Sequence, residues 1–499
     1  MTMDITTIPN PIYKPGAYFA FNTTLASRAL ATNDQKLLII AQRLTQTTAA
    51  EVLTPVNVFS DDEAALYFGR GSQAHRMARA AIKANQYIQL TVVGLDDAEA
   101  GVAATGSVVV NGTASGSGQV RLAICGTTVA VAVSQGDKAD DVMASLASAI
   151  TLQDDLPLSA TVGEIDGPDD GEGNPTKIKA LVLTARNKGS TGNECGLICT
   201  ITASGLTATL TPMSGGQGDP SLDAAFSAVF ASGHTMIMLP YTSDDALAKL
   251  SAHLDNVSGP LEQRGAVGIT GWNGTLASGT TLTSKVNAPR ISCGWHAGSA
   301  LPNGELAAVY GAVMASESDP ARPLNTLTLP GLDITPQDNW PGRTEQENAL
   351  MNGLTPFEVD GSVVRIVRSV STFVKNAAGV TDRSLMDITI IRSLDYVRLA
   401  CRTRYTQRFP REKLTDARLA RIRSELLDVL YSLEQLEIVE NVDALKDQLT
   451  VTRSLQDDTR AEATIPAAIV RGLHVFAAVI LHAGVRLSDV RRRQWPLNT

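Results

Sequence analysis

The sequence is poor in aromatic residues and has no long apolar run. Phe, Trp and Tyr make up 5% of the 499 residues, and no uninterrupted apolar stretch reaches 18 residues, so no membrane span is predicted. The first thirty residues lack a basic start followed by an apolar core, and we therefore expect no secretory signal. The net charge of −9 argues against a protein that coats nucleic acid, because phosphate binding needs a basic excess.

Cysteine and histidine do not form a recognisable catalytic or metal-binding pattern. Cys293 and His296 have CxxH spacing, but no second pair lies at zinc-finger spacing. Motifs for a nucleophile elbow, a P-loop, a dinucleotide-binding turn or a zinc protease are absent. We expect no catalytic residue, no metal site and no cofactor. The odd number of cysteines is interpreted as buried free thiols of a reducing compartment: Cys125, Cys195, Cys199, Cys293 and Cys401.

The acidic loop 166–174 (DGPDDGEGN) invites comparison with a calcium site. Pro168 occupies the third position, where an EF-hand needs a ligand, and no Glu stands at the twelfth. We interpret this segment as a solvated surface loop.

The length predicts about three domains, and two separated segments share one pattern. Residues 31–94 and 218–335 alternate strand-like and helix-like runs, which is typical of a mainly parallel sheet. Expected strands lie at 36–41, 87–94, 235–239, 265–270 and 290–293. Expected helices lie at 61–69 (with Ser60 as N-cap), 71–84, 222–231, 244–256, 276–286 and 305–315.

Residues 95–217 interrupt this alternation. They are rich in Gly, Ser, Thr and Val and favour short strands at 106–111, 119–125, 127–134, 179–185 and 200–210, with one helix at 140–150. Because the α/β pattern stops before the block and resumes after it, we interpret the block as an inserted β-rich domain. Its two ends should lie close together.

The two ends of the chain differ from the middle. Residues 1–30 predict an extended N-terminal arm that includes a strand-like run at 12–22. Residues 336–482 predict an α+β C-terminal domain, followed by a basic tail at 483–499. Within that domain we expect a helical start at 347–351, a turn at Asp360-Gly361, a strand at 363–374, and helices at 384–406 and 415–436. A hairpin at 449–453 and 460–465 and an apolar strand at 473–482 close it.

A cluster of basic residues lies between Arg398 and Arg423. It contains nine Arg and Lys residues, opposed only by Glu412 and Asp416. Two interpretations remain open: a solvated helical face, or a docking surface for an acidic partner.

Three stretches resemble contractile phage tail-sheath proteins, particularly their Mu-like branch. Residues 347–373 (ENALMNGLTPFEVDGSVVRIVRSVSTF) resemble the start of the sheath C-terminal domain. Residues 472–480 (GLHVFAAVI) resemble the final strand of the family, and the Pro-Gly-x-Tyr wording at 15–18 resembles its N-terminal start. The middle of the chain matches by architecture alone.

The resemblance implies a structural subunit of the virion rather than an enzyme. Copies would form hexameric rings stacked helically around the tail tube, assembled in the host cytoplasm together with tube, baseplate and tail terminator proteins. Contraction would drive the tube through the host envelope for genome ejection, without direct contact to nucleic acid and without membrane insertion. The resemblance suggests inter-subunit arms that contain Tyr18, Phe19, Phe21, Val475, Phe476 and Val479, with the hairpin near 449–465 as acceptor. With the charge pattern, it suggests tube-facing candidates: Arg411, Lys413, Arg418 and Arg421.

The alternative is an α/β enzyme or ligand-binding protein with a β-rich accessory domain. Such a protein should have a ligand-sized pocket and a small, defined oligomeric state. A sheath subunit should form long tubes.

Overall fold

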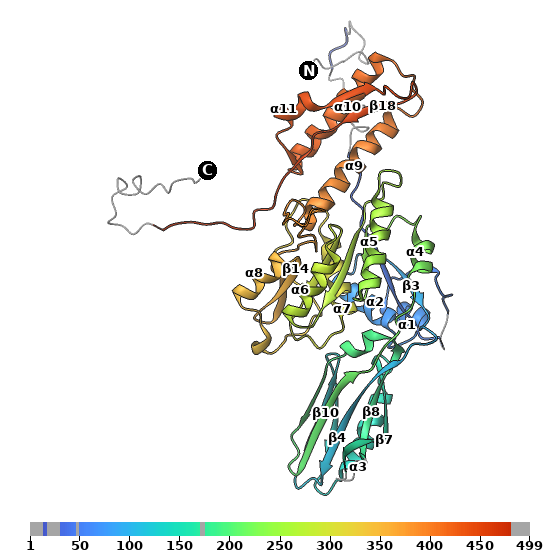
Figure 1. Cartoon of the computed structure of the whole chain (residues 1–499), viewed down its shortest axis with the longest axis vertical. Coiled ribbons are helices and arrows are strands. Elements are labelled where there is room, and N and C mark those ends of the chain that lie inside the picture. The colour runs from blue at the N-terminus through green and yellow to red at the C-terminus, as the bar shows by residue number, and fades with distance from the viewer. Residues whose placement is uncertain (1–12, 17–29, 46–48, 170–174, 481–499) are drawn as a thin grey trace.

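The molecule is elongated and consists of three parts (Figure 1). This computed structural model describes residues 13–16, 30–45, 49–169 and 175–480. An α/β body lies in the middle, a β-rich domain extends from one end of it, and a smaller C-terminal domain stands at the other end on the long helix α9 (Ile388–Arg408).

The body is built on an eight-stranded mixed sheet. Its order is β15-β14-β13-β12-β11-β1-β3-β2, with parallel pairing from β14 to β3 and an antiparallel strand at each edge. The edge strands are short, which limits pairing with other chains. The strand bounds are β1 Lys36–Gln42, β2 Pro55–Asn57, β3 Gln89–Leu95, β11 Met236–Met238, β12 Val267–Trp272, β13 Ile291–Trp295, β14 Leu354–Asp360 and β15 Val363–Ile366.

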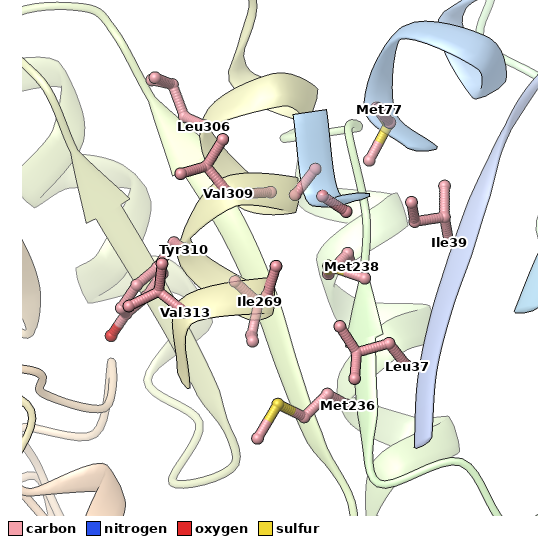
Figure 2. Packing of buried hydrophobic residues seen from close by; sticks show 14 of the residues in the cluster. Leu37, Ile39, Met77, Met236, Met238, Ile269, Leu306, Val309, Tyr310 and Val313 are labelled. Carbon is pink, nitrogen blue, oxygen red and sulfur yellow. The ribbon is translucent and has the colours of Figure 1, made fainter. Parts of the chain in front are cut away.

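Helices cover both faces of this sheet because its strands are apolar on both sides. In β1, Leu37 and Ile39 belong to one buried cluster, and Leu38 and Ile40 to the other. Figure 2 shows the first cluster, where side chains of the helix after β13 pack on β1, β11 and β12. The first face is covered by α1 (Asp61–Phe68), α2 (Gln73–Ala84) and α7 (Asn303–Ser316). The second is covered by α4 (Asp223–Val229), α5 (Asp244–Ser258), α6 (Leu276–Val286) and α8 (Arg343–Met351).

The α/β alternation expected from the sequence is present, and the Ser60 hydroxyl accepts a hydrogen bond from the Glu63 amide as the expected N-cap. The sheet nevertheless continues past residue 335, where we expected a new domain to begin, because β14 pairs with β13 in parallel register. The boundary expected at residue 336 is therefore wrong, since β14 and β15 belong to the body.

The predicted long strand at 363–374 is also wrong. Asp360-Gly361 forms the expected turn, but β15 ends at Ile366. Beyond it, the Val370 amide donates to Thr355 Oγ1 and the Thr372 amide to the Ile291 carbonyl. These bonds, to a side chain of β14 and to the first residue of β13, replace the pairing of a longer β15, which β-branched composition alone does not reveal.

In its described residues, the β-rich domain has two sheets, one α-helix and a short 3-10 helix at Ser190–Glu194 around its own core. A four-stranded sheet has the order β10-β4-β8-β7, and a three-stranded sheet the order β6-β5-β9. Their bounds are β4 Ala103–Gly112, β5 Gly118–Ile124, β6 Thr127–Val133, β7 Leu158–Asp169, β8 Pro175–Lys188, β9 Leu197–Ile201 and β10 Leu206–Ser214, with α3 at Ala139–Thr151. The single strand expected at 200–210 is in fact β9 and β10, separated by a turn at Gly205 with φ of +86°. β7 was not predicted from the sequence.

The ends of this domain meet at its junction with the body. The Val102 amide donates to the Gln217 carbonyl at 2.8 Å, and the Gln217 amide returns a bond at 3.1 Å. This closeness is what an insertion requires.

Cys125 and Cys195 form a disulfide, so the expectation of free thiols is wrong for this pair. They are 70 residues apart in sequence. The Cys125 amide donates to the Gly196 carbonyl at 2.9 Å, which brings the end of β5 beside the turn before β9. Cys199, Cys293 and Cys401 are free.

We expect the β-rich domain to be dispensable for assembly. Replacement of residues 103–216 by a short Gly/Ser linker should leave a folded body, because the bond between Val102 and Gln217 already holds the exit and the entry together. The variant should still polymerise, as judged by electron microscopy. A variant that folds by circular dichroism yet never polymerises would contradict this prediction.

Candidate assembly surface

The C-terminal domain is built on two helices. α9 and α10 (Asp416–Gln435) pack together, and α10 buries the face expected from its spacing, with Leu419, Ile422, Leu426, Leu430 and Leu433 inside. Short elements follow: β16 (Val439–Glu440), α11 (Val442–Leu445), β17 (Thr450–Arg453), β18 (Ala461–Thr464) and β19 (Ala468–Ile469).

The hairpin of β17 and β18 has open edges. In the part of the chain that the structure describes, these two strands pair only with each other. Every residue of β18 is exposed, and Val451 is the one half-buried side chain of β17. Exposed strand edges present unpaired amides and carbonyls, so they can accept a further strand.

The segment after β19 leaves the body and carries apolar side chains into solvent (Figure 1). Leu473 and Val475 are each 77% exposed, and Phe476, Val479 and Ile480 between 84% and 95%. The predicted strand at 473–482 is not formed within the described residues, which reach residue 480. Leaving such a run exposed is unfavourable by the usual transfer free energies, so this segment suits burial against another chain.

His474 anchors the root of this segment. Its Nδ1 lies 2.9 Å from Asn325 Nδ2, and its Nε2 lies 3.5 Å from Asp387 Oδ1 at the N-terminus of α9. Arg368 also binds Asp387 through two hydrogen bonds of 2.8 and 3.0 Å. Although burial opposes its ionisation, hydrogen bonds from His474 and Arg368 hold the pKa of Asp387 at about 2. Asp387 therefore stays charged, and His474 remains half-buried between the exposed side chains of Leu473 and Val475.

The N-terminal arm can be followed only in part. Tyr18, Phe19 and Phe21 lie outside the described residues. Further along, Leu30 packs against the core of the C-terminal domain, and the Tyr396 hydroxyl donates to the Ala31 carbonyl at 2.9 Å. The chain thus passes α9 before it enters the body at β1.

The basic cluster of the sequence divides into neutralised and exposed members. Arg404 is buried and paired with Glu425 and Asp428, and Arg398 is paired with Asp395. The interpretation that only Glu412 and Asp416 oppose the cluster is therefore wrong, because the folded chain brings acids from outside residues 398–423 to these side chains.

Of the four tube-facing candidates, Arg418 is half-buried and lies 3.1 Å from Glu412. The Arg421 guanidinium lies 5.9 Å from the ring centre of Phe409. Arg411 and Lys413 are exposed in the loop between α9 and α10. These four residues thus gather at one end of the C-terminal domain.

The junction between the body and the β-rich domain contains a carboxyl group that sequence reasoning missed. The first amide of α7, at Asn303, donates to Glu194 Oε2 at 3.0 Å, and Asn273 Nδ2 donates to the Glu194 carbonyl at 3.1 Å. Burial raises the pKa of Glu194 to about 8. No local pattern marks Glu194, because its partner lies 109 residues away.

Glu194 predicts a pH-dependent stability. The pKa of Glu194 is higher in the folded than in the unfolded chain. Its contribution to the free energy of unfolding is therefore complete below about pH 4.5 and is lost as pH rises through about 8. Glu194→Gln should flatten the dependence between pH 5 and pH 9 by roughly 4 kcal/mol, at about 1.4 kcal/mol for each unit of pKa difference in that window, measured by thermal unfolding. An unchanged pH profile in the variant would contradict this assignment.

Cys293 and His296, the pair with CxxH spacing, are both buried in the body. Burial raises the pKa of Cys293 to about 12, and the His296 ring bonds the Asp333 carbonyl at 2.8 Å. Within the described ranges, no three His, Cys, Asp or Glu side chains are grouped to hold a metal ion. No helix among them is both long and apolar enough to cross a membrane.

An open hairpin and an exposed apolar segment in one chain are typical of a protein that assembles with other chains. Comparisons with known proteins identify the class. The family model "Phage tail sheath protein central domain" matches residues 215–372, and the "Phage tail sheath C-terminal domain" model matches residues 380–480. The Mu-like prophage FluMu tail sheath protein of Haemophilus influenzae is 32% identical and covers 96% of this chain and 99% of its own length. The chain belongs to the phage tail sheath family, a family of structural proteins of the virion.

Solved structures of similar proteins include further sheath proteins. The sheath tail protein of Desulfitobacterium hafniense has a TM-score of 0.49 at 15% identity and covers 92% of this chain and 97% of its own. That of Listeria innocua has a TM-score of 0.46 at 13% identity, covering 86% and 91%. A chain of the anti-feeding prophage baseplate has a TM-score of 0.47 at 11% identity, covering 95% and 99%.

Proposed function

We propose that this chain polymerises as stacked hexameric rings around a tail tube and contracts to drive that tube through the host envelope for genome ejection. Contraction requires no chemical step. The extended sheath is a kinetically trapped arrangement, and triggering lets the subunits move into a packing of lower free energy. Baseplate and tail terminator proteins would bound the polymer at its two ends.

The observation that carries this proposal is that one chain has both an open hairpin and an exposed apolar segment. β17 and β18 offer two edges, while residues 475–480 of the same chain are extended and in solvent. If the segment of one subunit adds to the hairpin of the next, backbone hydrogen bonds link the rings while the bodies move. The N-terminal arm would use the second edge.

Negative-stain microscopy of the purified chain tests this function. Long tubes of uniform diameter are expected. A small oligomer that binds a metabolite, and never forms tubes under any condition of salt or concentration, would favour the enzyme alternative.

We also propose that the exposed basic end of the C-terminal domain faces the tube. Arg411, Lys413, Arg418 and Arg421 lie together there, and charge complementarity would set the register between sheath and tube. A contact between charges would tolerate small shifts of the sheath along the tube better than a contact between closely packed apolar side chains.

Charge reversal tests this contact. Arg418→Glu with Arg421→Glu should reduce co-assembly with the tube several-fold at low salt, and the difference should shrink as salt screens the interaction. The readout is the fraction of tube protein that sediments with sheath. Arg121→Glu with Lys138→Glu, on the exposed surface of the β-rich domain, is the matched control and should change nothing. Equal losses in both pairs would contradict the proposal.

A further inference from the structure

A basic cleft lies where α9 meets the body. It has a volume of about 330 Å³ and lies between the segment that enters β1, the loops before β11 and β12, and one face of α9. Four basic side chains and two acidic ones line it: Lys36, Arg264, Arg392, Arg402, Asp34 and Asp395. The face of α9 presents its residues at spacings of three and four, so Arg392 and Arg402 belong to one stripe.

Arg392 is the unusual member of this lining. Arg392 is only 7% exposed, and its terminal nitrogen NH2 donates a hydrogen bond to the Glu317 carbonyl at 2.7 Å. The other terminal nitrogen, NH1, is buried and has no hydrogen-bond partner among the described residues. Leaving a charged donor unpaired in the interior is unfavourable, so NH1 calls for an acceptor that the described residues do not supply.

The remaining charges of the cleft do not fill this need. Asp395 lies 2.7 Å from Arg290 and 2.7 Å from Arg398, so its carboxylate is already neutralised. Asp34 accepts from the Thr32 hydroxyl at the exposed rim. Arg264 pairs with Glu262 and lies over the ring of Phe230. No ion pair is formed by Lys36, Arg392 or Arg402 within the described ranges, which leaves a net positive cleft.

We propose that this cleft is an oxyanion site that takes one phosphate or carboxylate group. Arg392 NH1 would donate from the floor, and Arg402 and Lys36 would supply charge from the rim. Guanidinium groups suit this ligand because their donors match the geometry of carboxylate and phosphate oxygens. The bound group would join the three elements that border the cleft: the entry to β1, the loops before β11 and β12, and α9. It would therefore stiffen the connection between the body and the C-terminal domain.

Calorimetry on the full chain tests the site with inorganic phosphate and, separately, glutarate, each against chloride at constant ionic strength. One phosphate per chain is expected. Arg392→Gln should weaken binding by about tenfold or more, because it removes a charged donor from the interior. Arg402→Gln should weaken phosphate binding less. Because Arg402 is exposed, this variant should fold even where Arg392→Gln does not, and it then carries the test. Lys413→Gln, exposed but outside the cleft, is the matched control and should bind as the wild type does.

Absence of any uptake beyond the chloride control would overturn the proposal. So would equal affinity in the wild type, Arg392→Gln and Arg402→Gln.

The same titration on the assembled polymer distinguishes two sources of the ligand. If an acidic side chain of a second copy fills the cleft, the polymer should no longer bind phosphate, and Arg402→Gln should weaken assembly in phosphate-free buffer. If the ligand is a free ion, the polymer should still bind one phosphate per chain. Either result supports the site, which does not depend on the contraction proposed above.

Discussion

Removal of residues 475–499 should give a folded subunit that no longer forms tubes. The cut falls just after His474, the last residue of the segment that is anchored to the body, so no described contact of the core is lost. What is lost is the exposed apolar run at 475–480, whose burial against another subunit we propose as the link of the polymer. Tube formation should fall below detection by negative stain, while the thermal unfolding midpoint should stay within about 2 °C, because the change does not touch a buried group.

Two further variants separate the parts of that effect. Removal of residues 483–499 alone takes away the basic tail and keeps the apolar run, so tubes should persist. Removal of residues 1–22 takes away the other arm and should also give a soluble, folded, non-polymerising subunit. Tubes of normal length from the 475–499 or the 1–22 truncation would show that the bodies alone hold the polymer together.

Glu305→Gln should strongly destabilise the body. Glu305, in the first turn of α7, forms an ion pair with Arg76 of α2, and these side chains are 12% and 7% exposed. Burial raises the pKa of Glu305 and lowers that of Arg76 despite their attraction, so removing water from the two charges is the dominant effect. Removing one partner leaves the other buried without compensation, which typically costs 3–5 kcal/mol, on the order of the stability of a domain. Chemical denaturation of the two proteins measures this loss.

The double variant Arg76→Met with Glu305→Leu separates charge from packing. Apolar residues of similar volume in place of a buried pair are often neutral or even stabilising. We therefore expect the double variant to be at least as stable as the wild type, although removing the Glu305 carboxylate alone is strongly destabilising. A loss in the double variant equal to that of Glu305→Gln would show that the pair contributes net stability here.

The body was predictable because its signal is local. Short apolar runs such as 36–41 alternate with helices that carry capping residues such as Ser60, and both features depend on neighbours in sequence. The end of β15 was not predictable, because Val370 and Thr372 have strand-like side chains but bond to Thr355 and Ile291. The disulfide of Cys125 and Cys195 was missed for a related reason. Free thiols were expected from the odd number of cysteines and a reducing compartment, whereas the pairing of distant strands decides which thiols meet.

The candidate assembly surface was predictable in composition but not in electrostatics. The apolar sequence of residues 473–480 already indicated a segment that needs burial against another chain. The net charge of the basic cluster was overestimated. Arg404 of α9 pairs with Glu425 and Asp428 of α10, and a count of charges within residues 398–423 does not include these two acids. Helical spacing within α10 could have shown that both acids lie on a face turned toward α9, but only after the two helices were known to pack.

The single helix α9 has a mechanical consequence. It begins directly after Asp387, which contacts Arg368 and His474, and it carries the C-terminal domain at its far end. Its 21 residues correspond to a rod of about 31 Å. A tilt of about 10° at its base would displace its tip by about 5 Å, roughly one helical turn. A small angular change at the base of α9 would thus displace the far end of the C-terminal domain by about the spacing between adjacent strands.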